Sequence, residues 1–130
     1  MAHYIDASAL VKLVLPESES AALLSWLAED ERRPTSCELA RTELLRAVRR
    51  ESPEQDLRAW MILERIDLTA LMRSTFDRAG VLGPPGLRAL DAIHLAAALD
   101  LGDDLEGMVT YDQRQAEAAR ANGIPVVAPA

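Results

Sequence analysis

The sequence has 130 residues, of which 49% are hydrophobic and 27% charged, a balance that excludes a disordered chain and fits one domain over residues 1–130. The net charge of −7 argues against a protein that coats nucleic acid without specificity. We expect a cytoplasmic protein, because no signal peptide or membrane-spanning apolar run is visible and the single cysteine, Cys37, cannot form an internal disulfide.

Apolar periodicity and turn residues predict short strands that alternate with helices. The first half contains a strand over 4–6, a helix capped by Ser8 and ended by Pro16, a helix over 19–29, a strand over 34–36 and a helix through 39–48. The second half contains a helix through 60–63, a strand from Ile66, helices over 71–79 and 87–99, a strand over 108–110, a helix over 113–121 and a strand over 125–127. This alternation predicts an α/β fold with a mostly parallel sheet covered on both faces.

Two aspartates fall where predicted strands end. Asp6 ends the first strand, and Asp112 follows the strand over 108–110. Either residue alone is best explained as the N-cap of the helix that follows it. Ligands of such sheets bind at the carboxyl ends of the strands, so the pair together favours a functional site.

Two further acids lie on the apolar faces of predicted helices. At about 100° per residue, Glu43 falls on the stripe that contains Leu39, and Asp91 falls on the stripe that contains Leu95. A carboxylate in such a position needs a hydrogen-bond partner or a cation. Ordinary salt bridges would satisfy each acid, with Arg46 or Arg50 for Glu43 and with Arg88 for Asp91. Two such acids beside two strand-end acids favour a shared cation.

The residue types of this set indicate a hard metal ion. Four carboxylates without a cysteine or histidine cluster suit Mg²⁺ or Mn²⁺ better than zinc. Such ions hold phosphate esters and lower the pKa of a water for in-line attack on phosphorus. The sequence contains no recognisable Ser-His-Asp set and no glycine-rich phosphate loop, so metal-assisted hydrolysis is the chemistry that the residues favour.

Four segments of the chain resemble, in order and in spacing, the PIN domains, and specifically the VapC-type ribonuclease toxins of bacterial toxin–antitoxin pairs. The segments are YIDASALVKL, ELARTELLRAV, LRALDAIHLAAAL and MVTYDQRQAEAA. The resemblance implies a three-layer α/β/α sandwich around a short parallel sheet. It also implies that Asp6, Glu43, Asp91 and Asp112 form the acidic quartet that binds Mg²⁺ or Mn²⁺, with the hydroxyls of Ser8 and Thr110 beside it.

The same resemblance implies an activity and partners. Members of this kind hydrolyse phosphodiester bonds of a tRNA or a ribosomal RNA loop, leaving 5′-phosphate and 3′-hydroxyl ends, and so inhibit translation. They form homodimers and hetero-oligomers with a cognate VapB-type antitoxin. Arg88 and Arg114 are adjacent in sequence to proposed ligands and are the candidates for contacts with the substrate phosphate.

Several alternatives stay open at this point. Glu38 competes with Glu43, but it lies about 140° away around the helix, so only one of them can face the pocket. His94 is either a packed histidine, a residue that orients Asp91, or a general base. As a whole, the chain is alternatively a catalytically silent PIN-like interaction module. A Mg²⁺-binding phosphoacceptor signalling domain fits less well, because the only lysine is Lys12, near the start.

Overall fold

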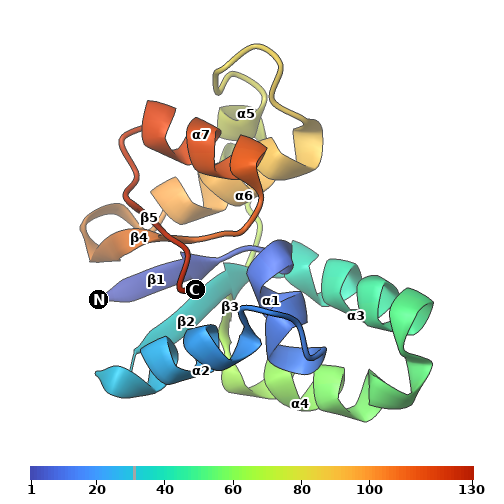
Figure 1. Cartoon of the computed structure of the whole chain (residues 1–130). Helices are drawn as coiled ribbons and strands as arrows, with labels where there is room; N and C mark the ends of the chain where they lie inside the picture. Colours follow the sequence, from blue (N-terminus) through green and yellow to red (C-terminus); the bar gives the residue numbers. More distant parts are fainter. Residues whose placement is uncertain (31) are drawn as a thin grey trace.

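The computed structural model describes residues 1–30 and 32–130 (Figure 1). The strands are β1 (Ala2–Ile5), β2 (Arg33–Cys37), β3 (Asp67–Thr69), β4 (Leu105–Val109) and β5 (Val126–Val127). The helices are α1 (Ala7–Val14), α2 (Ser20–Glu29), α3 (Leu39–Glu51), α4 (Asp56–Arg65), α5 (Arg73–Ala79), α6 (Ala89–Leu99) and α7 (Gln113–Ala121). Short 3₁₀ turns at Pro53–Gln55 and Gly102–Asp104 precede α4 and β4.

The strands form one sheet in the order β3-β2-β1-β4-β5, and every pair of neighbours is parallel. Tyr4 of β1 is therefore paired with Thr35 of β2 on one side and with Met108 of β4 on the other. The order reverses between β1 and β4, because the chain moves outward from β1 in both directions. In open α/β sheets, the crevice at the carboxyl ends of such strands is where ligands bind.

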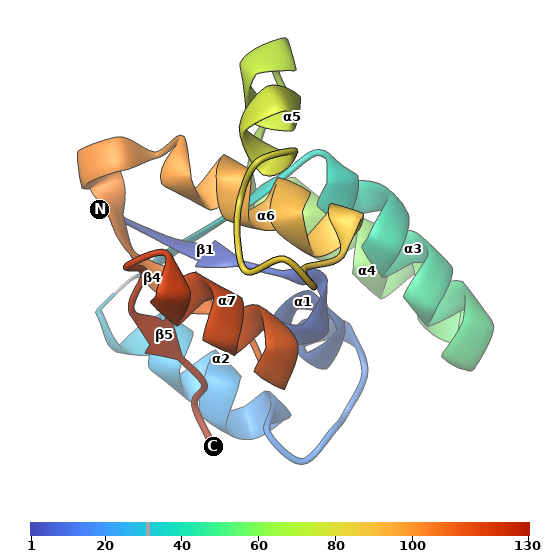
Figure 2. The same ribbon diagram turned by 90° about the horizontal axis from the view of Figure 1, so that it is seen from above.

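Helices cover both faces of the sheet (Figures 1 and 2). Helices α1 to α4 lie on one face, and their buried residues, such as Leu10 and Leu44, pack with Ile5 and Val109. Helices α6 and α7 lie on the other face, where Leu95 and other buried residues pack with Tyr4, Cys37 and Met108. Helix α5 packs against α6 on that side. The predicted three-layer α/β/α sandwich is therefore confirmed, and its sheet is parallel throughout.

Most predicted elements are present, with shifted ends. The prediction that Ser8 caps the first helix is wrong, because Asp6 is the N-cap of α1 and accepts a hydrogen bond from the backbone N–H of Ala9. Ile66 does not start a strand: it is the C-cap of α4, and β3 begins at Asp67. Helix α7 has the predicted bounds, and Gly123 after it takes a φ of +77°, which favours glycine.

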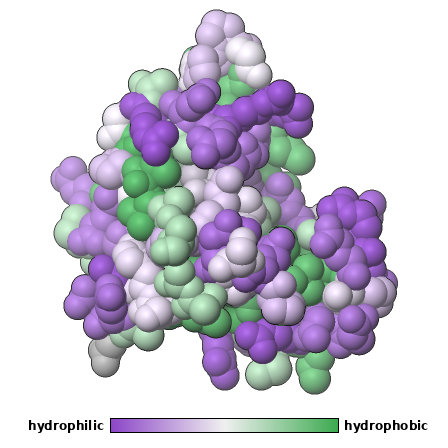
Figure 3. Space-filling view, viewed as in Figure 1, coloured by the Kyte–Doolittle hydropathy of each residue, from purple (hydrophilic) through white to green (hydrophobic). Residues whose placement is uncertain are grey.

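The surface in the view of Figure 1 is mostly polar, with hydrophobic side chains gathered in small separate areas (Figure 3). Among the described residues, no helix has both the length and the apolar character needed to cross a membrane.

Candidate active site

Asp6 is the most buried of the four predicted acids. It follows β1 directly, and its side-chain environment consists of neutral donors. Ser8 Oγ donates to Asp6 Oδ1 at 2.6 Å, and Thr110 Oγ1 donates to Asp6 Oδ2 at 2.5 Å. Burial raises the pKa of Asp6, and these hydrogen bonds oppose that shift. The carboxylate is thus fixed in position but has no ion-pair partner among the residues that the structure describes.

Asp112 lies beside Asp6 through a shared hydroxyl. Thr110 Oγ1 accepts a hydrogen bond from the backbone N–H of Asp112 at 3.1 Å while it donates to Asp6. The side chain of Asp112 is exposed, and its Oδ1 caps α7 by accepting from the N–H groups of Arg114 and Gln115. Asp6 and Asp112 therefore do cap helices, as expected. Because β1 and β4 are paired in parallel, with Ile5 opposite Val109, the two aspartates also come to the same crevice at the carboxyl ends of these strands.

Asp91 lies in the first turn of α6 and is half-buried. Burial raises its pKa, and the negative charge of Asp112 raises it further. The charge of Glu43 acts in the same direction, while His94 and Arg88 oppose it. The charges of Asp112 and Glu43 thus both act against ionisation of Asp91, which is the electrostatic situation that a divalent cation relieves.

Glu43 is held by a histidine and not by an arginine. The Nε2–H of His94 donates to Glu43 Oε1 at 2.5 Å, so the alternative salt bridges to Arg46 and Arg50 are wrong. His94 is buried, as expected of a packed histidine, but among the described residues its ring hydrogen-bonds to Glu43 and not to Asp91, so the expectation that it orients Asp91 is wrong. The side chain of Glu43 is 23% exposed, against 3% for that of His94. Glu38, the rival acid, faces Arg41 at 3.9 Å near the protein surface.

Tyr4 and Cys37 contact the other ring nitrogen of His94, on the side away from Glu43. The hydroxyl of Tyr4 is 2.7 Å from His94 Nδ1, and the two rings meet edge to face with centroids 5.8 Å apart. Cys37 Sγ lies 3.9 Å from the same nitrogen. Burial alone lowers the pKa of His94, but the hydrogen bonds with Cys37 and Glu43 and the charges of these two groups outweigh it and raise the pKa to about 10.

Arg88 and Arg114 line one small cavity of about 180 Å³ together with Asp91. Arg88 is the N-cap residue of α6, and Arg114 lies in the first turn of α7, so both guanidinium groups come from the same helix ends as Asp91 and Asp112. The loop around Pro84 and Gly86 forms another wall of the cavity. Both arginines are exposed, as a contact with a substrate requires.

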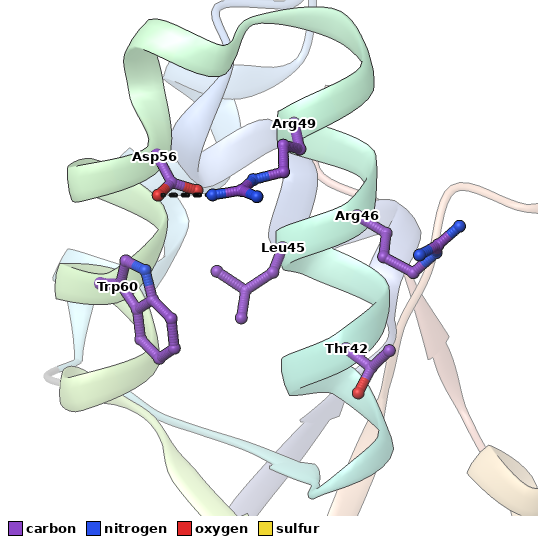
Figure 4. A pocket seen from close by; sticks show the side chains of 6 residues that line it. All are labelled: Thr42, Leu45, Arg46, Arg49, Asp56 and Trp60. Carbon is purple, nitrogen blue, oxygen red and sulfur yellow. Dashed lines mark ion pairs between the residues drawn. The ribbon is translucent and has the colours of Figure 1, made fainter.

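A larger cavity, about 390 Å³, lies between α3 and α4 (Figure 4). Trp60 and Leu45 face each other across it, and an Arg49–Asp56 ion pair of 3.7 Å bridges the two helices. None of the four predicted acids lines this cavity. The hollow between α3 and α4 is therefore separate from the acidic site.

The donor set is of the type that the implied metal prefers. All four predicted ligands are carboxylates, which suit Mg²⁺ and Mn²⁺, and burial together with the charges of Asp112 and Glu43 raises the pKa of Asp91. Within residues 1–30 and 32–130, however, no three His, Cys, Asp or Glu side chains stand close enough together to form a finished cage. Mg²⁺ needs only one or two carboxylates, because it keeps waters or takes phosphate oxygens as its other ligands. The residues fit that mode of binding.

The sequence did not predict the contacts of two residues in this region, Tyr4 and Gln115. Tyr4 reads as an ordinary strand residue, and nothing local indicates that its hydroxyl meets His94. Gln115 is 1% exposed and donates from Nε2 to the backbone carbonyl of Asp91 at 3.2 Å, which ties α7 to α6. Its place three residues after the cap Asp112 fits the capping-box pattern, a signal that could have marked it.

The chain is similar to known proteins over nearly its whole length. Residues 3–121 match the family described as PIN domain. Ribonuclease VapC46 of Mycobacterium tuberculosis is 42% identical over 126 residues, which cover 97% of this chain and 96% of that protein. Ribonuclease VapC35 of the same species is 45% identical over 132 residues, with the same coverage.

Two solved structures share the fold. Mycobacterium tuberculosis VapC20, described as a Sarcin-Ricin loop cleaving toxin, superposes with a TM-score of 0.79 at 13% identity, covering 98% of this chain and all of that one. A toxin–antitoxin complex from Klebsiella pneumoniae gives a TM-score of 0.72 at 21% identity, covering 99% of this chain and 98% of that one.

Proposed function

The chain belongs to the PIN-domain family, and from that membership we propose that it is the endoribonuclease toxin of a toxin–antitoxin pair. The observation that carries the proposal is the placement of acids at the point where the strand order reverses. Asp6 and Asp112 follow the two strands on either side of that point, and Asp91 is within electrostatic reach of Asp112. This is where an α/β sheet binds its ligand.

The proposed cofactor is Mg²⁺ or Mn²⁺, bound between Asp6, Glu43, Asp91 and Asp112, with one or two of these carboxylates as direct ligands and the others reached through water. When bound, such an ion lowers the pKa of a water and neutralises charge on a phosphate. Ser8 and Thr110 keep the Asp6 carboxylate in one orientation through their hydrogen bonds to its two oxygens.

Arg88 and Arg114 supply the contacts with the RNA backbone in this proposal. A guanidinium group matches the geometry of phosphate oxygens and stays charged at any physiological pH. Their shared cavity opens beside Asp91, so a phosphate bound there would neighbour the reacting one.

The proposed reaction is hydrolysis of an RNA phosphodiester bond. Water attacks phosphorus, the bond from phosphorus to the 3′ oxygen breaks, and that oxygen takes a proton. The products are a 5′-phosphate and a 3′-hydroxyl. We propose a tRNA or a ribosomal RNA loop as the substrate, since VapC20 is described as cleaving the Sarcin-Ricin loop. Unpaired bases in such loops are what proteins read in RNA. Cleavage would inhibit translation.

The proposed partners are a VapB-type antitoxin and a second copy of the toxin. The similarity to a chain of a toxin–antitoxin complex supports the antitoxin. We place the reaction in the cytoplasm, because the proposed RNA substrates are there.

The test is cleavage of total bacterial RNA by the purified protein, freed of antitoxin. Parallel reactions contain Mg²⁺, Mn²⁺ or EDTA, and the new ends are mapped by sequencing. We expect a few discrete sites with 5′-phosphate ends in Mg²⁺ or Mn²⁺, and none in EDTA. Cleavage that EDTA leaves unchanged would contradict the metal mechanism. A protein that neither cleaves RNA nor binds Mn²⁺ would instead be a silent interaction module.

A further inference from the structure

Glu43 differs from the other predicted acids in how its side chain is fixed. Asp6 and Asp112 are short side chains anchored at helix N-termini, whereas Glu43 is longer and projects from the second turn of α3. Its side chain is 23% exposed, so packing alone does not select one conformation. Ordering a long glutamate side chain costs conformational entropy.

The hydrogen bond from His94 removes that freedom. His94 Nε2 lies 2.5 Å from Glu43 Oε1, a short contact that joins α6 to α3 across the site. Among the residues that the structure describes, Glu43 Oε2 makes no hydrogen bond, so this second oxygen is available to another ligand.

The imidazole ring is itself fixed from behind. Its Nδ1 lies 2.7 Å from the Tyr4 hydroxyl, and the ring stands edge to face against that of Tyr4. His94 and Tyr4 are 2% and 0% exposed, and neither ring can turn without disturbing the core beside the sheet. A chain of contacts thus runs from β1 through α6 to α3.

This arrangement excludes the general-base alternative for His94. Both ring nitrogens already have partners, Glu43 on one side and Tyr4 on the other. At 2% exposure the ring has no open path to a water beside the substrate. A packed histidine without a role would need no carboxylate partner such as Glu43.

We propose that His94 is a positioning residue that holds Glu43 Oε1 so that Glu43 Oε2 faces the metal ion, with Tyr4 fixing the imidazole ring. The inference rests on the proposed function, since it assigns Glu43 to the metal. Partners that orient ligands in this way commonly contribute 10- to 100-fold in metal affinity.

The test measures Mn²⁺ affinity by calorimetry and by electron paramagnetic resonance, independently of cleavage. We expect His94→Leu to weaken Mn²⁺ binding about 10- to 100-fold. His94→Gln should retain much of the affinity, because the N–H of the glutamine amide Nε2 can still donate to Glu43 Oε1 in place of His94 Nε2. Tyr4→Phe should weaken binding less, because it removes only the support behind the ring. Circular dichroism and thermal unfolding without metal identify any variant that fails to fold. If His94→Leu does not fold, the Mn²⁺ affinities of His94→Gln and Tyr4→Phe still test the inference.

A double-mutant cycle separates positioning from a general loss of structure. If His94 acts through Glu43, His94→Leu adds no further loss of Mn²⁺ affinity in a Glu43→Gln protein. Additive losses would overturn the inference, as would a folded His94→Leu protein that binds Mn²⁺ as the unmodified chain does. Failure of the unmodified chain to bind Mn²⁺ would overturn the metal proposal itself, and that result is distinct from either of the others.

Discussion

The Thr110 hydroxyl at the end of β4 donates a 2.5 Å hydrogen bond to the Asp6 carboxylate at the end of β1, which joins residues 104 positions apart. The contact exists because β1 and β4 are adjacent parallel strands whose carboxyl ends meet. Ser8 donates to the other oxygen of Asp6 at 2.6 Å. The fold thus keeps a buried carboxylate in place with neutral hydrogen-bond donors, and the charge of His94 offsets only part of the effect of burial on its pKa.

The first prediction concerns the cost of that charge. Asp6→Asn should raise the free energy of unfolding without metal, because burial raises the pKa of Asp6 and the neutral amide avoids that desolvation penalty. The same substitution should abolish cleavage. Thermal unfolding with and without Mn²⁺ checks both effects, since Mn²⁺ should stabilise only the unmodified protein. A less stable or still active variant would contradict this account.

The second prediction compares two glutamates at the start of one helix. Glu43→Gln should lower kcat for RNA cleavage at least 10-fold, because it removes a proposed metal ligand. Glu38→Gln is the matched control, since Glu38 faces Arg41 and not His94. It should retain kcat within about 2-fold and fold equally well. Equal losses in the two variants would show that the proposed ligand was misassigned.

The third prediction concerns the two arginines of the small cavity. Arg88→Ala and Arg114→Ala should each raise KM for RNA several-fold and weaken its dependence on salt, because each removes a phosphate contact. The exposed Arg73 on α5 provides a control, and Arg73→Ala should leave KM unchanged. Kinetics at 50 and 200 mM salt make the comparison. An unchanged KM and salt dependence for both variants would remove these arginines from the substrate site.

The fourth prediction tests the core beneath α3. Leu44 is fully buried, so Leu44→Ala should cost about 2–5 kcal/mol in the free energy of unfolding. Leu57 on α4 is 73% exposed, and Leu57→Ala should change it by no more than about 0.5 kcal/mol. Urea unfolding followed by circular dichroism measures both values. Similar costs at the two positions would mean that Leu44 is not packed as the structure places it.

The fifth prediction concerns how the stability of the protein depends on pH through His3, whose Nδ1 lies 3.5 Å from Glu106 Oε2. Burial lowers the pKa of His3 below 6.5, and the charges of Arg32 and the N-terminus also lower it, while Glu106 opposes them. The unfolded chain therefore binds a proton more readily than the folded one, and stability falls as the pH drops below 6.5. His3→Phe keeps an aromatic ring against Trp26 and should reduce this loss. A variant that loses stability between pH 7 and 5 as steeply as the unmodified protein would contradict the assignment.

Local patterns were enough to predict most elements and the places of the acids. The bounds of α7 follow from the cap Asp112 and from Gly123, both of which act within a few residues. The start of α1 was misassigned because Ser8 and Asp6 are both good caps, and the choice between them depends on where β1 ends.

The partner of Glu43 could not be predicted in this way. Helical spacing places Glu43 on the inner face of α3, but its contact is His94, 51 positions further along the chain. Arg46 and Arg50 are nearer in sequence and lie on the outside of the same helix. Only the packing of α6 against the sheet brings His94 and Tyr4 together behind Glu43.

The most direct test of the central claim is the rate of cleavage of one mapped RNA as Mn²⁺ is titrated into the unmodified protein and into Asp6→Asn. The account predicts a rate that rises with Mn²⁺ and saturates for the unmodified protein, and no cleavage above background for the variant at any concentration. A saturating, metal-dependent rate in the Asp6→Asn protein would contradict the claim that the acids at the strand ends form the catalytic centre.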